Sequence, residues 1–407
     1  MVCLAVAITF TAYLFSPLWW TEIGADARVL YAAGTLSARG GDPYNLASLE
    51  AEEDRLYNPA GTTRVFRHAP YGYPPLVTTA LRAASGLSEL HFYLATVALL
   101  LACGLGGFEL FLSLLAWRGR ALARVFFLAS TPMALDVFVG NPSAILMLAA
   151  GAGAWLTARG RPFWGGVALA LLAVKPQVGL PIAAAVLLAA PAAAAPSGHR
   201  LRAGLVAGLG LAAGLLVLAA AAVAFEGSSA FPRWAATLTS FGAALGPAGS
   251  GSEFSQSGLA GYPALMPFLP PAVAVVVAAL VVAPPIAWTI WRKRDRMAGP
   301  TFAPLALAMA AALGVSPYLH MNDLILGALP LLVVAAARPR LIIGATLVLW
   351  AVGAPLRLVL AAALALAGVT FSASGRAGFG VILTATLLVS VIAVVNAPGQ
   401  DPAGPAS

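Results

Sequence analysis

The chain has 407 residues, of which 60% are hydrophobic and only 9% are charged, with a mean hydropathy of +0.89 and a formal net charge of +8. A soluble domain carries roughly 25% charged residues, so the 23 basic and 15 acidic residues are too few to cover a soluble fold of this length. This excludes a cytosolic enzyme, a disordered scaffold and a nucleic-acid-binding module, and it leaves a polytopic membrane protein.

Apolar runs long enough to cross a bilayer recur along the chain. A spanning helix needs about 20 mostly apolar residues, because the hydrocarbon core is about 30 Å thick. The first run has no basic segment before it and no clear cleavage site after it, so we interpret it as a retained span. We predict an all-α membrane fold of about 11–13 spanning helices, near 1–20, 90–117, 121–138, 142–158, 162–175, 177–195, 203–225, 266–291, 301–316, 321–337, 341–356, 358–374 and 378–396.

The charged residues segregate between alternate connectors. Five connectors hold 13 of the 23 basic residues, at 118–124, 159–161, 200–202, 292–296 and 338–340. The remaining connectors hold 12 of the 15 acidic residues. Because cytoplasmic loops carry the excess of Lys and Arg, we predict a multi-pass plasma-membrane protein with a cytoplasmic N-terminus and an acidic outer face.

The polar chemistry is expected on that outer face. It holds two loops and three tight turns, at 21–89, 226–265, 136–141, 175–177 and 316–323. The first loop is rich in Gly, Pro and Tyr, which favours alternating helix and turn, and one acidic stretch at 47–56 is predicted to be helical. We treat residues 1–396 as one membrane domain and the Pro/Gly/Ala-rich residues 397–407 as a disordered tail.

Two ionisable residues stand out because charge at membrane depth is costly. Asp26 follows the first span and is well placed for a general base; the alternative is an interfacial acid that pairs with Arg28 or caps a helix. Lys175 lies between apolar runs beside Pro176. It can hold an anionic phosphate, or it can be an interfacial lysine that extends toward the headgroups.

The late turn and the first-loop tyrosines have two interpretations as well. His320 and Asp323 follow Pro317 and are expected to lie on the outer face with Asp26 and Lys175. The alternative is that residues 322–323 form a helix cap. The tyrosines are typical of an interfacial belt, but they are also suited to stacking on sugars; they are Tyr31, Tyr44, Tyr57, Tyr71 and Tyr73.

Several short motifs occur in series along the chain. They are Asp26-Ala27-Arg28-Val29-Leu30-Tyr31, Gly41-Asp42-Pro43-Tyr44, Tyr71-Gly72-Tyr73-Pro74-Pro75, Gly140-Asn141-Pro142-Ser143, Val174-Lys175-Pro176 and Ser316-Pro317-Tyr318-Leu319-His320-Met321-Asn322-Asp323. In this order the series resembles glycosyltransferase family 87, which contains polyprenyl-phosphate-mannose-dependent α-1,2-mannosyltransferases. Asn141 sits two places earlier than the asparagine of the family's Gly-x-x-Asn turn.

The resemblance implies a GT-C fold and an inverting transfer of a hexose, with mannose as the family default, from a polyprenyl-phosphate donor to a lipid-linked or cell-envelope glycan. It implies that Asp26 is the general base and that the remaining site residues bind substrate: Tyr31, Asp42, Tyr44, Tyr73, Asn141, Lys175, His320 and Asp323. The expected partners are the donor, a glycolipid or glycan acceptor and membrane lipid, with no nucleic acid.

Neither a metal nor a cofactor is expected. The two cysteines, Cys3 and Cys103, have no metal-ligand spacing, and the sequence shows neither a soluble Rossmann domain nor an Asp-x-Asp pair, so nothing implies a nucleotide sugar. The alternative function is a multi-pass transporter or flippase of a lipid-linked solute, which would show inverted repeats; none is visible. A non-catalytic membrane scaffold is the third possibility, and it would not need polar clusters on one face.

Overall fold

The computed structural model describes residues 24–57, 71–115, 120–128, 130–194, 199–244, 302–316 and 322–337, with isolated residues at 280, 284, 288–289 and 391–392. Across these ranges the regular structure is helical and contains no strand. The prediction of an all-α fold is confirmed for this part of the chain. The predicted spans near 1–20, 266–291, 341–356, 358–374 and 378–396, and the tail, lie wholly or largely outside the described residues.

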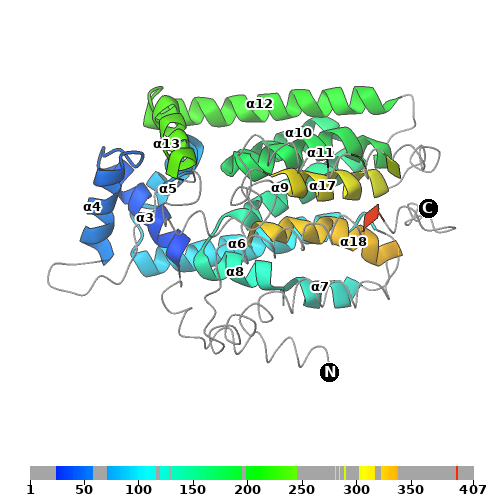
Figure 1. Ribbon diagram of the computed structural model, residues 1–407, viewed down its shortest axis with the longest axis horizontal. Helices are drawn as coiled ribbons and strands as arrows, with labels where there is room; N and C mark the ends of the chain where they lie inside the picture. Colours follow the sequence, from blue (N-terminus) through cyan, green and yellow to red (C-terminus); the bar gives the residue numbers. More distant parts are fainter. Residues whose placement is uncertain are drawn as a thin grey trace.

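In its described residues, 24–57 and 71–89, the first predicted outer loop contains three short helices. α3 (Ala25–Ala38) begins after Gly24, whose backbone is left-handed with φ 66°, a conformation that glycine adopts without steric cost. α4 (Leu46–Tyr57) covers the acidic stretch and confirms that it is helical. α5 (Pro75–Ala84) begins on a proline, which the first turn of a helix tolerates. α3 packs against both α4 and α5, and the three gather at one end of the molecule (Figure 1).

Two described helices are long and apolar enough to cross a membrane. They are α6 (Glu89–Leu112) and α12 (Arg200–Glu226), and they match the spans predicted near 90–117 and 203–225. The Ser88 side chain caps α6 by accepting a hydrogen bond from a backbone N–H of the first turn. Together with the composition, these helices indicate a membrane protein.

The segment predicted as one span over 121–138 forms two helices, so that expectation is wrong. α7 (Arg120–Leu128) ends before Ser130, and α8 (Thr131–Val139) begins after it. The physical reason is that Ser130 caps a new helix start, and Pro132, which has no N–H to donate, is accommodated in the first turn of that new helix.

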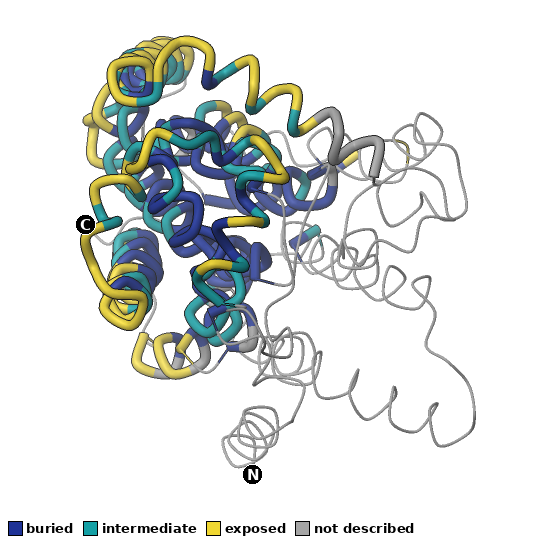
Figure 2. The backbone as a smooth tube through the Cα atoms, turned by 90° about the vertical axis from the view of Figure 1, so that its left-hand side faces the viewer, coloured by how far each residue is buried: buried dark blue, intermediate teal, exposed yellow. Residues whose placement is uncertain are grey.

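The other predicted spans of the described part are helical close to their expected bounds, with short 3-10 segments at two of the turns. These elements are α9 (Ser143–Ala158), α10 (Pro162–Leu169), η1 (Ala170–Val174), α11 (Pro176–Ala194), α17 (Ala303–Val315), η4 (Asn322–Gly327) and α18 (Ala328–Ala337). α13 (Ala230–Ala244) forms the beginning of the second predicted outer loop. The core includes buried residues of α6, α9, α11, α17 and α18, and Figure 2 shows that buried residues gather in the interior of the described part while exposed residues lie on its outer side.

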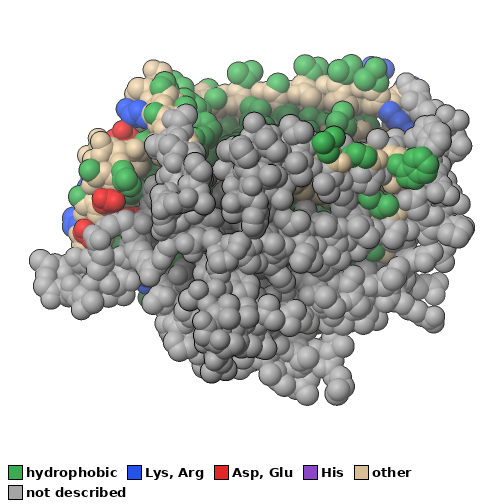
Figure 3. Space-filling view, viewed as in Figure 1, with side chains coloured by type: hydrophobic (Ala, Val, Ile, Leu, Met, Phe, Trp, Pro, Cys, Tyr) green, Lys and Arg blue, Asp and Glu red, His purple; other side chains and the backbone are tan. Residues whose placement is uncertain are grey.

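Small residues allow close packing of the helices. A side chain on Gly107 of α6 would collide with the backbone of Met147 in α9, and one on Gly166 of α10 would collide with the backbone of Ala207 in α12. Such interfaces are common between helices in membranes. On its other face α12 exposes large apolar side chains, including Leu209, and Figure 3 shows hydrophobic side chains along this helix.

Candidate active site

One aspartate holds the turn between α8 and α9. Asp136 is fully buried and accepts hydrogen bonds from the backbone N–H groups of Ser143 at 3.2 Å and Ala144 at 2.8 Å. These are first-turn donors of α9, which have no partner within the helix itself. Asp136 therefore ties α8 to the start of α9 and fixes the position of Asn141 between them.

Gly140 allows α3 to reach this turn. It ends α8 with a left-handed backbone at φ 76°, and a Cβ on it would lie 2.5 Å from the Cβ of Ala27. Beside this contact, the backbone N–H of Gly24 donates to the carbonyl of Phe138 at 2.9 Å. Because Asp26 lies in the first turn of α3, the same contacts bring its carboxylate to the α8–α9 turn.

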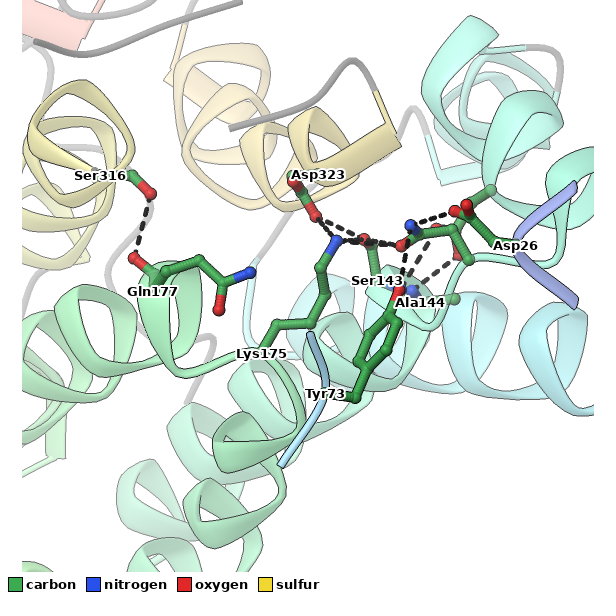
Figure 4. Close-up of polar contacts among 10 residues, drawn as sticks. Asp26, Tyr73, Ser143, Ala144, Lys175, Gln177, Ser316 and Asp323 are labelled. Atoms are coloured by element: carbon green, nitrogen blue, oxygen red, sulfur yellow. Dashed lines mark hydrogen bonds and ion pairs between the residues drawn. The ribbon is translucent and has the colours of Figure 1, made fainter. Parts of the chain in front are cut away.

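Asp26 pairs with Asn141. The side-chain amide of Asn141 donates to Oδ2 of Asp26 at 2.5 Å and to the hydroxyl of Tyr73 at 3.4 Å (Figure 4). Asn141 is only 4% exposed, whereas Asp26 and Tyr73 are half-buried. Neither alternative reading of Asp26 describes this geometry, since Arg28 lies 3.6 Å from Glu89 and α3 has no side-chain cap.

Lys175 lies at the break between η1 and α11. It is 3% exposed, and its ammonium pairs with Asp323 of η4 at 2.5 Å. The same ammonium donates to Oδ1 of Asn141 at 3.0 Å and to Oγ of Ser143 at 3.1 Å. The interpretation of an interfacial lysine reaching toward the headgroups does not describe this buried side chain.

Three predicted turns thus meet in the structure. Figure 4 shows side chains from the α8–α9 turn, the η1–α11 break and η4 pointing toward one another. At the neighbouring end of α17, Ser316 donates to the backbone carbonyl of Gln177 at 3.1 Å and holds that end against α11. Asp323 joins these side chains through its ion pair with Lys175, so it does more than begin a helix. We call the connected side chains the polar cluster; they are Asp26, Tyr73, Asp136, Asn141, Ser143, Lys175 and Asp323. His320 lies outside the described residues.

Sequence reasoning did not single out two members of the cluster. The Ser143 hydroxyl donates to Oδ1 of Asp323 at 2.5 Å and lies 2.7 Å from Oδ1 of Asn141. Asp136 supplies the cap described above. The sequence contains an indication for each of these residues. Asp136 is an acid among apolar residues, and Ser143 follows Asn141 at the start of a predicted span.

The predicted tyrosines occupy different places. The Tyr44 hydroxyl donates to the backbone carbonyl of Tyr73 at 3.0 Å, and Asp42 accepts a hydrogen bond from the Tyr44 backbone at 3.1 Å and pairs with Arg233 at 3.2 Å. These contacts support the loop that carries Tyr73. Tyr31 lies apart from the cluster, with its hydroxyl donating to the carbonyl of Leu87 at 2.9 Å.

The Tyr73 hydroxyl lies beside the same amide as Asp26 and has a proton available to donate. It accepts a hydrogen bond from Asn141, while its own proton has no protein acceptor among the described residues. Burial raises the pKa of Tyr73 well above its ordinary value, and the nearby carboxylates of Asp26 and Asp323 raise it further. The phenol therefore stays protonated at neutral pH. Within the described ranges no group of His, Cys, Asp and Glu is arranged to hold a metal ion.

A comparison with family models identifies the chain. The model of glycosyltransferase family 87 matches residues 70–317, which is more than half of the 407 residues. The chain belongs to glycosyltransferase family 87. It is therefore a glycosyltransferase, which confirms the sequence resemblance and favours the enzyme over the transporter. No significant match was found among curated proteins or among solved structures.

The match in this glycosyltransferase covers only part of the cluster. Tyr73, Asn141 and Lys175 lie within the matched segment, whereas Asp26 precedes it and Asp323 follows it. The tertiary structure joins these two acids to the matched residues through the hydrogen bond of Asn141 and the ion pair of Lys175.

Proposed function

We propose that this glycosyltransferase transfers a hexose, with mannose as the first candidate, from a polyprenyl-phosphate donor to a hydroxyl of a lipid-linked or cell-envelope glycan, with inversion. The transfer takes place at the outer face of the plasma membrane, in a polytopic GT-C-like fold. The observation that carries the proposal is the position of Asp26, a half-buried carboxylate that lies with the half-buried Tyr73 at the edge of a polar cluster whose other members are buried.

The chemistry needs a single base. Asp26 takes the proton of the acceptor hydroxyl, the acceptor oxygen bonds to the anomeric carbon, and the bond from that carbon to the phosphate oxygen breaks. Polyprenyl phosphate leaves with the electron pair. The phosphate is already a good leaving group, so no second carboxyl group is needed as an acid, unlike in glycoside hydrolysis. Oδ2 of Asp26 accepts from Asn141, which leaves Oδ1 for the acceptor hydroxyl.

Tyr73 is well placed to bind a sugar hydroxyl. Its protonated phenol lies beside the same amide as Asp26, and its proton has no protein acceptor in the described part of the chain. Roles as substrate contacts for Tyr31, Asp42, Tyr44, His320 and Asp323 stay predictions, and of these His320 lies outside the described residues. A contact of Lys175 with the donor phosphate is also a prediction, and its ammonium is paired with the carboxylate of Asp323.

The charges at the two ends of α12 support an outward-facing site. The helix begins with Arg200 and Arg202 and ends at Glu226, and its 27 residues span about 40 Å at 1.5 Å per residue. At the Glu226 end, Ser37 of α3 donates to the carboxylate at 2.8 Å. The helix that carries Asp26 is therefore at the acidic end of α12, and basic ends are the cytoplasmic ones.

The direct test is transfer by membranes that contain the protein. Labelled polyprenyl-phosphate mannose and polyprenyl-phosphate glucose are supplied to right-side-out and inverted vesicles, each with a panel of lipid-linked glycan acceptors. We expect transfer from one of these donors when donor and acceptor reach the outer face. Transfer only from a nucleotide sugar, or only at the cytoplasmic face, would refute the proposal.

A further inference from the structure

The ammonium of Lys175 is fully occupied by the protein. An ammonium group has three N–H donors, and the structure supplies three acceptors: Oδ1 of Asp323 at 2.5 Å, Oδ1 of Asn141 at 3.0 Å and Oγ of Ser143 at 3.1 Å. Lys175 is 3% exposed and Asp323 is fully buried. In this arrangement the lysine has no remaining donor for a ligand.

These contacts determine which way the Asn141 amide points. Lys175 has donors and no acceptors, so it must face the oxygen of the amide. The NH₂ group then faces Asp26 at 2.5 Å and the Tyr73 hydroxyl at 3.4 Å. A flipped amide would place its NH₂ against the ammonium and its oxygen against a carboxylate, which is unfavourable at both ends. Lys175 thus selects the orientation in which Asn141 donates to Asp26.

We propose that Asn141 is a positioning residue for Asp26, and that Lys175 acts through Asn141 rather than as a ligand of the donor phosphate. Asn141 holds Oδ2 of Asp26, so that Oδ1 is presented to the acceptor hydroxyl. Ser143 and Asp323 complete the buried frame that holds Lys175. The inference rests on the proposed role of Asp26 as the base.

The alternative role of Lys175 has a structural consequence. If its ammonium moved to a phosphate, the fully buried carboxylate of Asp323 would lose the ammonium with which it now pairs. Separating a buried ion pair is unfavourable, because the attraction between its two charges is lost in a site of low dielectric. Asn141 would at the same time lose the contact that orients its amide. The frame is therefore better suited to holding Asn141 than to releasing Lys175.

A double-mutant cycle separates the two roles. Asn141→Ala, Lys175→Met and the double variant are compared for kcat and for the KM of the polyprenyl-phosphate sugar. We expect each single variant to lose about 10- to 100-fold in kcat with little change in donor KM, since a small displacement of a catalytic group has this cost. The double variant should be no worse than the poorer single variant, because Lys175 acts through Asn141.

A direct phosphate ligand would behave differently. Lys175→Met would then raise the donor KM by the same factor with and without Asn141, and that result would overturn the proposal. Because Lys175→Met removes the ammonium beside the fully buried Asp323, a second variant, Lys175→Met combined with Asp323→Asn, removes both charges. If the single variant does not accumulate in membranes, this second variant is measured in its place. It should then show the same fall in kcat at an unchanged donor KM.

The closing experiment needs no substrate. Asn141→Asp keeps the shape and can still accept from Lys175, but it cannot donate to Asp26 and places a second carboxylate against it. Infrared difference spectroscopy, with the Asp26 band assigned by Asp26→Asn, follows protonation of this carboxyl against pH. We expect Asn141→Asp to shift the titration upward by about one pH unit or more, since adjacent carboxylates resist sharing charge. Asn45→Asp adds the same charge at an exposed position of the first loop and should not shift it.

The outcomes distinguish this inference from the proposed function. A shifted Asp26 titration in Asn141→Asp, found in a protein that transfers no sugar from a polyprenyl phosphate, supports the positioning role and refutes the proposed function. Sugar transfer by the wild-type protein, together with an unshifted Asp26 titration in Asn141→Asp, supports the function and overturns the positioning role.

Discussion

Asn141 and Asp26 are 115 positions apart in the sequence, yet the amide of one donates to the carboxylate of the other at 2.5 Å. The contact joins the first helix of the described chain to the turn between α8 and α9. It depends on Gly140, which lets the two segments approach, and on Asp136, which holds the turn.

Asp26→Asn should nearly abolish turnover while donor binding is kept. The substitution preserves the volume and removes the base, and a well-placed general base contributes about 10²- to 10⁴-fold in rate. Asp42→Asn is the matched control from the same loop, because Asp42 is observed to support a turn and to pair with Arg233. Single-turnover transfer and donor binding check both variants. Near-normal turnover in Asp26→Asn, with loss in Asp42→Asn, would mean that the base is Asp42.

Asp136→Ala should lower both stability and activity. Two backbone donors at the start of α9 lose their acceptor, which we expect to cost about 1–2 kcal/mol as for other lost helix caps, and the turn that carries Asn141 loosens. Thermal unfolding in detergent and kcat measure the two effects. Ser88→Ala is the control, because it removes the cap of α6 away from the cluster. Ser88→Ala should lower the unfolding temperature without lowering kcat. If kcat falls equally in Ser88→Ala and Asp136→Ala, the loss of activity does not arise from a local effect of Asp136.

Gly140→Ala should impair transfer far more than Gly160→Ala. Both glycines have a left-handed backbone, with φ 76° and 74°, so both substitutions incur a similar backbone cost, on the order of 1 kcal/mol. Only Gly140 faces another segment, since a Cβ there lies 2.5 Å from the Cβ of Ala27 whereas nothing lies within 4 Å at Gly160. We expect kcat to fall about 10-fold or more in Gly140→Ala and to stay near wild type in Gly160→Ala.

The stability supplied by Glu52 should depend on pH in the acidic range. Burial by itself raises the pKa of Glu52, but hydrogen bonds from Arg55 and Thr35 and the charge of Arg39 outweigh it and lower the pKa below its ordinary value. A lowered pKa in the folded state means that the stabilisation is present above about pH 4.3, the ordinary value for Glu, and is lost as pH falls through the folded-state pKa.

Thermal unfolding of the wild type and of Glu52→Gln at a series of pH values checks this sign. The wild type should unfold at a higher temperature near pH 7, and the difference should shrink below about pH 4.3. The reason is that the Glu52 carboxylate of α4 accepts hydrogen bonds from Thr35 of α3 at 2.9 Å and from Arg55 of its own helix at 2.7 Å, and these contacts are strongest while it is ionised. A difference that grows on acidification would contradict the assigned direction of the pKa.

Composition and pattern were sufficient for the class of the molecule and for most helices of its described part. The scarcity of charge indicated a membrane protein, and the apolar runs predicted α6, α9, α11 and α12 close to their observed bounds. These features depend on the length and spacing of apolar runs, which can be read directly from a single sequence. The break between α7 and α8 also has a local cause, since Pro132 is accommodated in the first turn of a new helix.

The partners of each polar side chain were decided by the tertiary structure. Sequence spacing offered Arg28 or a helix cap as alternatives for Asp26 and no protein partner for Lys175, whereas the structure pairs Asp26 with Asn141 and Lys175 with Asp323, 148 positions away. Such pairs form only where backbones approach closely, as α3 does to the α8–α9 turn at a glycine, and burial then obliges each polar atom to find an acceptor or donor within reach. Neighbours in the chain do not determine that choice, because it depends on which segments meet in space.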